Sequence, residues 1–217
     1  MPVLDEAAGI GIALQALAPL RARGHEVIVV DGGSADLTST LATGGADLVI
    51  ASPRGRARQM NTGAAKAQGE VLLFLHADTL LPDGADRLVQ QALAGGRRWG
   101  RFDVRIAGRS PWLAVIAALM NLRSRPTGIA TGDQAIFVER ALFQQLGGYA
   151  EQPLMEDIEL SRRLRATGPP ACQHQRELTS GRRWEPRGVW RTVFLMWRLR
   201  WRYWRGEAPE SLARAYR

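Results

Sequence analysis

The chain has 217 residues, of which 46% are hydrophobic, so it is long and apolar enough for one globular domain and is not a disordered chain. Its single cysteine, Cys172, excludes an intramolecular disulfide, and its Cys and His residues lack the spacing of a zinc site. The net charge of +8 is concentrated in residues 182–217, which hold ten Arg against three Glu. We infer a reducing compartment, and the lack of a basic, apolar leader predicts a cytoplasmic catalytic domain.

Helix and strand patterns alternate along the first third of the chain. Apolar residues at helical spacing predict a helix over residues 9–23, which ends at Gly24. Short continuous apolar runs predict buried strands over residues 27–30, 48–51 and 71–75, with helices over residues 34–41 and 57–67 between them. This alternation with short links predicts an α/β fold with a mostly parallel central sheet flanked by helices.

The rest of the chain continues the pattern. We expect strands over residues 102–106 and 135–138, and helices over residues 82–93, 112–122, 140–146 and 157–167. The apolar segment 112–122 is too short to cross a bilayer. Because the basic charge begins after residue 181, we expect a catalytic domain over residues 1–181 and a basic, aromatic tail over residues 182–217.

The motif Asp31-Gly32-Gly33-Ser34 lies where a predicted strand turns into a helix. Glycines allow the backbone to approach a ligand, and an Asp at the end of a strand can accept hydrogen bonds from a nucleobase or a ribose. An ordinary turn with Ser34 as a helix cap explains the motif equally well. It does not match the glycine fingerprint of dinucleotide-binding proteins, which argues against a dehydrogenase.

His76 and Asp78 follow the predicted strand 71–75 and are two residues apart, so their side chains share one side. Such a pair can hold a divalent cation against a diphosphate and offset the charge that develops on a leaving group. The alternative is that Asp78 caps the helix that begins near Pro82.

Acidic residues gather at the start of the helix predicted over residues 157–167, in the run Glu156-Asp157-Ile158-Glu159. A carboxylate at this place can take a proton from an acceptor hydroxyl, and we expect Asp157 to be the base and Glu156 to assist it. Complementing the helix dipole is the competing explanation. Gly132 and Asp133, between a helix and a strand, are candidates for the acceptor side or form a polar turn. Arg58 is a candidate for binding the diphosphate.

Together these motifs resemble those of family-two glycosyltransferases with the GT-A fold. Residues 55–63 (GRARQMNTG) and 73–79 (LFLHADT) are similar to a small bacterial subfamily associated with radical-SAM and arsenosugar gene neighbourhoods. The likeness extends from Pro2 to about Pro209. It implies the GT-A fold and a donor site for a nucleotide-diphosphate sugar.

The resemblance also implies roles for single residues. Asp5 and Glu6 match the acidic motif at the end of the family's first strand, and Asp31 matches its base-binding Asp. Asp78 matches the last residue of its metal-binding D-x-D motif, and Asp157 matches the catalytic base. Here His76 replaces the first Asp of D-x-D. Because histidine ligates manganese more usually than the hard magnesium ion, the choice between Mn²⁺ and Mg²⁺, and metal dependence itself, stays open.

In the family, an apolar strand precedes the motif that matches Asp5 and Glu6, but here Met1 directly precedes Pro2-Val3-Leu4. Losing a central strand would leave buried backbone groups of its neighbours unpaired, at roughly 1 to 3 kcal/mol each. We therefore expect either a reading frame that starts further upstream or another segment in the strand's place.

Two features of the tail bear on function. Residues 180–185 (SGRRWE) are similar to an R-W element that some processive family members place near the acceptor and the diphosphate, which implies that Arg183 stabilises the leaving group and that Trp184 lies on the acceptor side. A surface turn explains these residues equally well.

The second feature is the segment 189–204, which predicts an amphipathic C-terminal helix that interleaves aromatic residues with Arg. This fits an anionic membrane interface, or packing on the catalytic domain or in a homodimer, and we expect no nucleic-acid partner.

We therefore expect an inverting glycosyltransferase that uses a nucleotide-diphosphate sugar, with uridine as the expected base, and an acceptor that the sequence does not identify. A nucleotidyltransferase is an alternative, but the chain lacks a glycine-rich phosphate loop near its N-terminus. A catalytically silent protein that binds nucleotide sugars or recruits partners to a membrane is the second alternative, suggested by His76 and by the basic tail.

Overall fold

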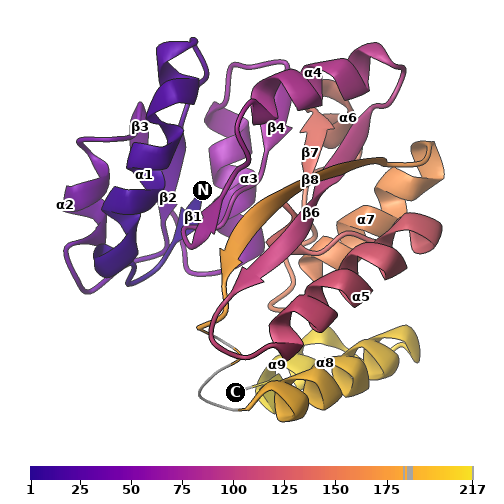
Figure 1. The fold of residues 1–217 in the computed structure, drawn as a ribbon. Helices are drawn as coiled ribbons and strands as arrows, with labels where there is room; N and C mark the ends of the chain where they lie inside the picture. The colour runs from indigo at the N-terminus through magenta and orange to yellow at the C-terminus, as the bar shows by residue number, and fades with distance from the viewer. Residues whose placement is uncertain (183, 185–187, 217) are drawn as a thin grey trace.

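A computed structural model of the chain describes residues 1–182, 184 and 188–216. It has an α/β architecture with two sheets, a three-stranded sheet in the order β1-β2-β3 and a five-stranded sheet in the order β4-β7-β6-β8-β5. The elements of the first sheet fill one side of the molecule, and the tail helices lie at one end of it (Figure 1).

The first sheet is wholly parallel and contains two of the three strands predicted from short apolar runs, 27–30 and 48–51. The third, predicted over residues 71–75, lies instead in the second sheet as an antiparallel strand, because it pairs with a distant strand. Its strands and helices are β1 (Pro2–Val3), α1 (Ala7–Ala22), β2 (Ile28–Asp31), α2 (Thr38–Ala42), β3 (Leu48–Ala51) and α3 (Arg56–Lys66). The apolar face of α1 packs on β2 through Ile10, Leu14 and Val29, which are all buried. Because β1 and β2 are parallel, Val3 and Asp31 lie side by side at their carboxyl ends.

The strand that precedes Asp5 consists of two residues, and its backbone groups are paired with neighbours. The carbonyl of Met1 accepts a hydrogen bond from the amide of Val30 at 2.9 Å. The side-chain amide of Gln59, on α3, donates to the carbonyls of Val3 at 2.8 Å and Val30 at 2.9 Å. Gln59 therefore joins β1 to β2 from the helix that covers them.

The second sheet is mixed. It contains β4 (Val71–Leu73), β5 (Thr79–Leu80), β6 (Trp99–Ala107), β7 (Phe137–Glu139) and β8 (Ala171–Ser180). β6 runs parallel to β8, whereas β4 and β6 pair with β7, and β5 with β8, in the antiparallel sense. The α/β class with a parallel sheet flanked by helices is thus confirmed, and the second sheet adds antiparallel pairs. We did not predict β8, because its sequence ACQHQRELTS has no apolar run.

The remaining helices mostly match the predicted ranges. They are α4 (Ala85–Ala94), α5 (Trp112–Thr127), the short 3₁₀ turn η1 (Gly132–Gln134), α6 (Arg140–Gln145), α7 (Glu156–Thr167), α8 (Val189–Trp204) and α9 (Pro209–Tyr216). One difference from the predicted ranges has a clear physical cause. The helix expected from residue 34 begins only at Thr38, because the carboxylates of Asp31 and Asp36 accept hydrogen bonds from Ser34 and Thr38 and hold the intervening residues in turns. α9 was not predicted.

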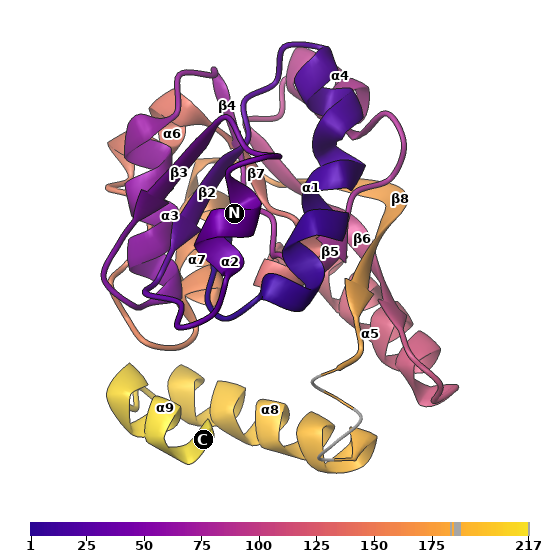
Figure 2. The same cartoon turned by 90° about the vertical axis from the view of Figure 1, so that its left-hand side faces the viewer.

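The tail helices α8 and α9 form a layer against one end of the body (Figure 2). Leu199 of α8 and Leu212 of α9 are buried against Met155, which precedes α7. Val193 of α8 is buried with Leu113 on α5. Among the residues that the structure describes, no helix is long and apolar enough to span a membrane.

Candidate active site

A cavity of about 430 Å³ opens where β1, the loop after β4, η1 and the N-terminus of α7 meet, and α8 and α9 close one side of it. Of the residues expected in the site, it is lined by Glu6, His76, Asp78, Gly132, Asp133, Glu156 and Asp157. Residues far apart in sequence thus converge as the motifs predict.

The carboxylate of Asp157 is held by two backbone amides. Its Oδ2 accepts a hydrogen bond from Gly132 at 2.8 Å, and its Oδ1 accepts one from Ile158 at 2.7 Å. A Cβ atom on Gly132 would lie 2.8 Å from the ring of His76, so this close approach requires glycine. A carboxylate fixed in this way inside a cavity is suited to accept a proton from a bound hydroxyl.

Glu156 differs from Asp157 in its surroundings. Only 3% of Glu156 is exposed, and its Oε1 lies 3.5 Å from Nη1 of Arg56. Burial raises the pKa of Glu156, the charge of Asp157 raises it further, and Arg56 opposes the shift. Glu156 is thus nearly buried and paired with Arg56, whereas both carboxylate oxygens of Asp157 are oriented by backbone amides, which favours Asp157 as the base.

His76 and Asp78 line the cavity but contact different partners. Nδ1 of His76 lies 3.4 Å from Oδ1 of Asp133, and Oδ2 of Asp78 lies 3.2 Å from Nε of Arg182. Arg182 also donates to the carboxylate of Glu6, with Nη1 2.8 Å from Oε2. The guanidinium of Arg182 thus bridges two expected donor-side acids.

No cluster of three metal-ligating side chains occurs in the described part of the chain. The pair His76 and Asp78 fits a site that is completed by a ligand, because a cation bound to a diphosphate needs few protein groups, and manganese accepts an imidazole beside a carboxylate. One imidazole and one carboxylate on the same loop therefore fit a cation shared with a diphosphate.

Four residues expected on the donor side lie outside the lining of this cavity. Asp31 accepts hydrogen bonds from Ser34, and Asp5 accepts one from the amide of Ala35 at 2.8 Å, so both stabilise the turn after β2. The amide of Gly32 donates to Val3. Arg58 is exposed and ion-paired with Glu151, 3.0 Å away.

Two expected residues lie in the segment that joins β8 to α8. Arg183 is outside the described residues. Trp184 lines a second cavity of about 420 Å³ between α5 and α8. This cavity adjoins the first, because four residues line both: Asp78, Asp133, Met196 and Arg200.

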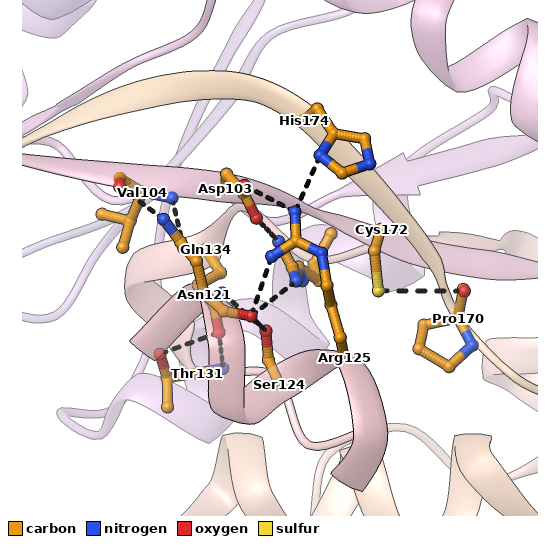
Figure 3. Close-up of polar contacts among 11 residues, drawn as sticks. Asp103, Val104, Asn121, Ser124, Arg125, Thr131, Gln134, Pro170, Cys172 and His174 are labelled. Atoms are coloured by element: carbon orange, nitrogen blue, oxygen red, sulfur yellow. Dashed lines mark hydrogen bonds and ion pairs between the residues drawn. The ribbon is translucent and has the colours of Figure 1, made fainter. Parts of the chain in front are cut away.

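A polar network connects α5 to the active-site turn (Figure 3). The side chain of Asn121 donates to the carbonyl of Val104 at 3.0 Å and accepts from its amide at 2.8 Å, which attaches α5 to β6. Ser124, one turn further along, accepts a hydrogen bond from Gln134, the last residue of η1, at 3.3 Å. The position of Gly132 and Asp133 therefore depends on α5.

Sequence analysis missed several cations that line the cavity, namely Arg56, Arg182 and Arg200. The sequence contains some indication that Arg56 is functional, since it belongs to the run 55–63. A solvated charge on a helix explained this residue equally well. Arg200 carried none, because the tail pattern does not indicate which of its arginines turns toward the body.

The comparisons with known proteins agree with this geometry. Residues 1–141 match the family model described as "Glycosyl transferase family 2". No curated protein matches the chain.

Several solved structures share the fold. TarS from S. aureus in complex with UDP superposes with a TM-score of 0.66 at 16% identity, over 82% of this chain and 58% of that one. The mannosyltransferase PcManGT from Pyrobaculum calidifontis, with GDP-Man and Mn²⁺, has a TM-score of 0.66 at 22% identity, over 99% and 67%. Glucosyl-3-phosphoglycerate synthase from Mycobacterium tuberculosis, with Mn²⁺, UDP and phosphoglyceric acid, has a TM-score of 0.56 at 20% identity, over 81% and 66%.

These likenesses confirm the expected GT-A fold. At this level of identity they are evidence for the fold alone. The chain spans 58% and 63% of the lengths of two of the structures that it matches, TarS and a mycobacterial protein.

Proposed function

Because the chain belongs to glycosyl transferase family 2, we propose that it transfers a sugar from a UDP-sugar to an acceptor hydroxyl with inversion at the anomeric carbon. The observation that carries this proposal is the carboxylate of Asp157, fixed by two backbone amides in the cavity. The UDP and GDP-Man bound in the similar structures support a nucleotide-diphosphate donor.

In the proposed reaction Asp157 takes the proton of the acceptor hydroxyl. The acceptor oxygen attacks the anomeric carbon as the bond from that carbon to the diphosphate oxygen breaks, and the electron pair leaves with the nucleoside diphosphate. A single displacement of this kind inverts the anomeric configuration. Glu156, nearly buried and 3.5 Å from Arg56, shapes the cavity beside the base.

Charge develops on the diphosphate as it leaves, and cationic groups in the cavity can offset it. Arg56, Arg182 and Arg200 all line the cavity. We assign His76 and Asp78 to a divalent cation, Mn²⁺ or Mg²⁺, that is shared with the diphosphate. Such an ion, when bound, supplies Lewis-acid stabilisation of the leaving group.

The proposed location is the cytoplasmic face of a membrane. Exposed apolar side chains form a surface, termed the aromatic face, on two neighbouring helices: Trp112, Val115, Leu119 and Leu122 of α5, and Trp190, Phe194, Trp197, Trp201 and Trp204 of α8. The rings of Trp112 and Trp190 are 4.9 Å apart, which joins the two helices into one surface. The exposed Arg191 and Arg198 lie on the same helix as the α8 aromatics. Trp at headgroup depth with Arg beside anionic lipid supports peripheral attachment over a dimer interface.

A two-stage measurement tests the proposed function. First, thermal shift with a panel of UDP- and GDP-sugars, with and without manganese, identifies the donor, because a ligand that binds the native state raises the Tm. Second, release of nucleoside diphosphate from that donor is followed for the wild type and for Asp157→Asn.

We expect a UDP-sugar to raise the Tm and to be turned over slowly by water. Binding without release of nucleoside diphosphate in any condition would favour the silent, nucleotide-sugar-binding alternative. If no nucleotide sugar shifts the Tm while nucleoside triphosphates do, the nucleotidyltransferase alternative replaces the proposal.

A further inference from the structure

The second cavity has one polar and one apolar end. Its apolar walls come from α5 and α8, through Ile116, Met120 and Val193, and two of its lining residues, Leu119 and Trp197, are also part of the aromatic face. At its other end it meets the active-site cavity at Asp133, Asp78, Met196 and Arg200. The two adjoining cavities therefore lie between the exposed aromatic face and the carboxylate of Asp157.

Three side-chain nitrogens of two arginines at the polar end lack hydrogen-bond partners among the described residues. Nε and Nη2 of Arg123 and Nε of Arg200 are buried and make no hydrogen bond with any residue that the structure describes. Burial, and then the charge of Arg200, lowers the pKa of Arg123 to about 10, and burial also lowers the pKa of Arg200, while the charge of Asp157 opposes both shifts. Burying cationic donors without an acceptor is costly, so the arrangement is complementary to an anion placed between them.

The order of groups along this space limits what binds there. Asp157 lines the first cavity, Arg200 lines both, and Arg123 lines the second together with the apolar side chains. A matching molecule therefore carries a hydroxyl, then an anionic group, then an apolar chain.

We propose that the acceptor is a membrane lipid in which a phosphate lies between an apolar chain and the hydroxyl that receives the sugar. The inference rests on the proposed function and deepens it. The hydroxyl oxygen forms the new bond to the anomeric carbon, its proton passes to Asp157, and the nucleoside diphosphate leaves with the electron pair. The phosphate stays unchanged between Arg123 and Arg200, and the chain extends through the second cavity to the aromatic face.

A soluble phosphorylated acceptor satisfies the two arginines but leaves the apolar walls of the second cavity in water. A neutral lipid fills the apolar walls but leaves the arginines unpaired. The lipid phosphate satisfies both ends, and the aromatic face places the opening of the cavity against the bilayer from which such a molecule comes.

An acceptor panel tests each part, using the full chain and the donor found by thermal shift. The complete probes are phosphatidylglycerol and phosphatidylinositol in phosphatidylcholine vesicles, which carry hydroxyl, phosphate and chain. Phosphatidylcholine alone lacks the hydroxyl, diacylglycerol in the same vesicles lacks the phosphate, and glycerol phosphate in solution lacks the chain. We expect transfer to a complete probe and at least tenfold less to each incomplete one.

Equal transfer to diacylglycerol would overturn the role of the arginines. Equal transfer to glycerol phosphate would overturn the role of the apolar cavity. If the donor binds and is hydrolysed but neither complete probe accepts sugar, the lipid acceptor is wrong while the proposed function stands. If no nucleotide sugar binds, the proposed function itself fails.

Arg123→Gln is the most direct variant, because Arg123 lines the second cavity and not the first. It should lower transfer to a complete probe by about tenfold or more, the usual effect of losing a charge-assisted hydrogen bond. Hydrolysis of the donor should be unchanged. Its matched control is Arg191→Gln, which removes the same charge from an exposed position on α8.

The Tm separates this role from a structural one. Since Arg123 has buried nitrogens without partners, its replacement should leave the Tm unchanged or raise it. A lower Tm with an equal loss of donor hydrolysis would mean that Arg123 supports the fold, and would overturn its assignment.

Met120→Trp narrows the apolar end of the second cavity. This variant should transfer less sugar to lipid and hydrolyse the donor at an unchanged rate. Unaltered transfer to lipid would count against binding of the lipid chain in this cavity.

Discussion

The backbone amide of Gly132 donates a hydrogen bond of 2.8 Å to Oδ2 of Asp157, which joins the turn η1 to the first turn of α7. The second oxygen accepts from the amide of Ile158, so both carboxylate oxygens are oriented by backbone donors. An uncharged amide at this position keeps the size of the side chain but no longer accepts a proton.

Asp157→Asn should therefore lower transfer by about 10²- to 10⁴-fold, the usual contribution of a general base. Donor affinity, measured by thermal shift, should change little. The Tm of the free protein should fall slightly, because the new NH₂ group faces one of the two backbone donors. Near wild-type turnover in this variant would remove Asp157 from the role of base.

Gly132→Ala tests how closely the turn approaches His76. A Cβ atom would lie 2.8 Å from the imidazole, so either the ring or the turn must move. We expect activity to fall at least tenfold, since displacements of about 1 Å at a reacting centre have large effects. Gly11→Ala, in α1 with nothing within 4 Å of its Cβ, is the control, and should stabilise the fold by roughly 0.5 to 1 kcal/mol without affecting activity. An active Gly132→Ala variant would show that the turn tolerates a side chain.

Asp78→Ala should weaken donor binding about tenfold or more, as expected for losing a charged group from the binding site. The variant should also show a smaller increase in donor affinity when manganese is added. In the wild type, a chelator should abolish that increase. The control is Asp83→Ala, an exposed Asp nearby in sequence. If the variant binds the donor as tightly as the wild type, Asp78 is not part of the site. If a chelator does not change donor binding by the wild type, the metal is not part of the proposal.

Glu177 provides a test of pH dependence. It is fully buried on β8, and burial, followed by the charge of Asp133, raises its pKa well above the ordinary value of 4.5. The raised pKa means that its stabilising contribution is complete below about pH 4.5 and is lost as the pH rises toward the folded-state value. Relative to wild type, Glu177→Gln should gain Tm progressively as the pH is raised above 4.5, and the exposed Glu70→Gln should not. A constant difference in Tm across the pH series would contradict the shift.

Replacement of Trp201 and Trp204 by alanine tests the membrane contact without touching either cavity. Both residues are exposed on α8, at 58% and 71%. The double variant should bind anionic vesicles at least about tenfold more weakly, since burying a large apolar side chain stabilises by roughly 1.5 to 3 kcal/mol. Salt should weaken the binding of the wild type, because it screens the exposed arginines.

The control for this pair is Ile12→Ala with Leu37→Ala, two exposed apolar residues outside α5 and α8. It should bind vesicles like the wild type. If size-exclusion chromatography instead shows a dimer that the tryptophan variant disrupts, the aromatic face is an interface between copies of the chain.

Local patterns predicted much of the fold. The strand Leu48–Ala51 and the helix Val189–Trp204 have the predicted bounds. The strand is a continuous apolar run, and the helix interleaves aromatic residues with Arg. β8 was missed because the polar residues Gln173, His174 and Gln175 interrupt any apolar pattern in it. Its pairing with β6 also depends on backbone groups far away in sequence. The second sheet is mixed for the same reason: strand direction depends on long-range pairing.

The candidate site was predicted where residues lie at the ends of apolar elements, as with His76, Asp78 and Asp157. Asp5 and Asp31 have the expected positions in sequence, but their carboxylates are engaged by the turn after β2. Arg200 shows the limit most clearly. Only the packing of Leu199 against the body turns the next residue inward, and no local pattern distinguishes Arg200 from the exposed Arg198.

α8 supplies Met196 and Arg200 to the active-site wall while Trp201 and Trp204 on the same helix face outward. Exchanging residues 182–217 between two relatives would therefore exchange the outward-facing tryptophans and this part of the active-site wall at once. Such a chimera would inherit the affinity for surfaces of one parent and, with it, one wall of that parent's catalytic pocket. Its His76 and Asp78 would still come from the other parent. If α8 has both of the roles proposed for it, membrane attachment and substrate choice are inherited together on one short segment of the gene.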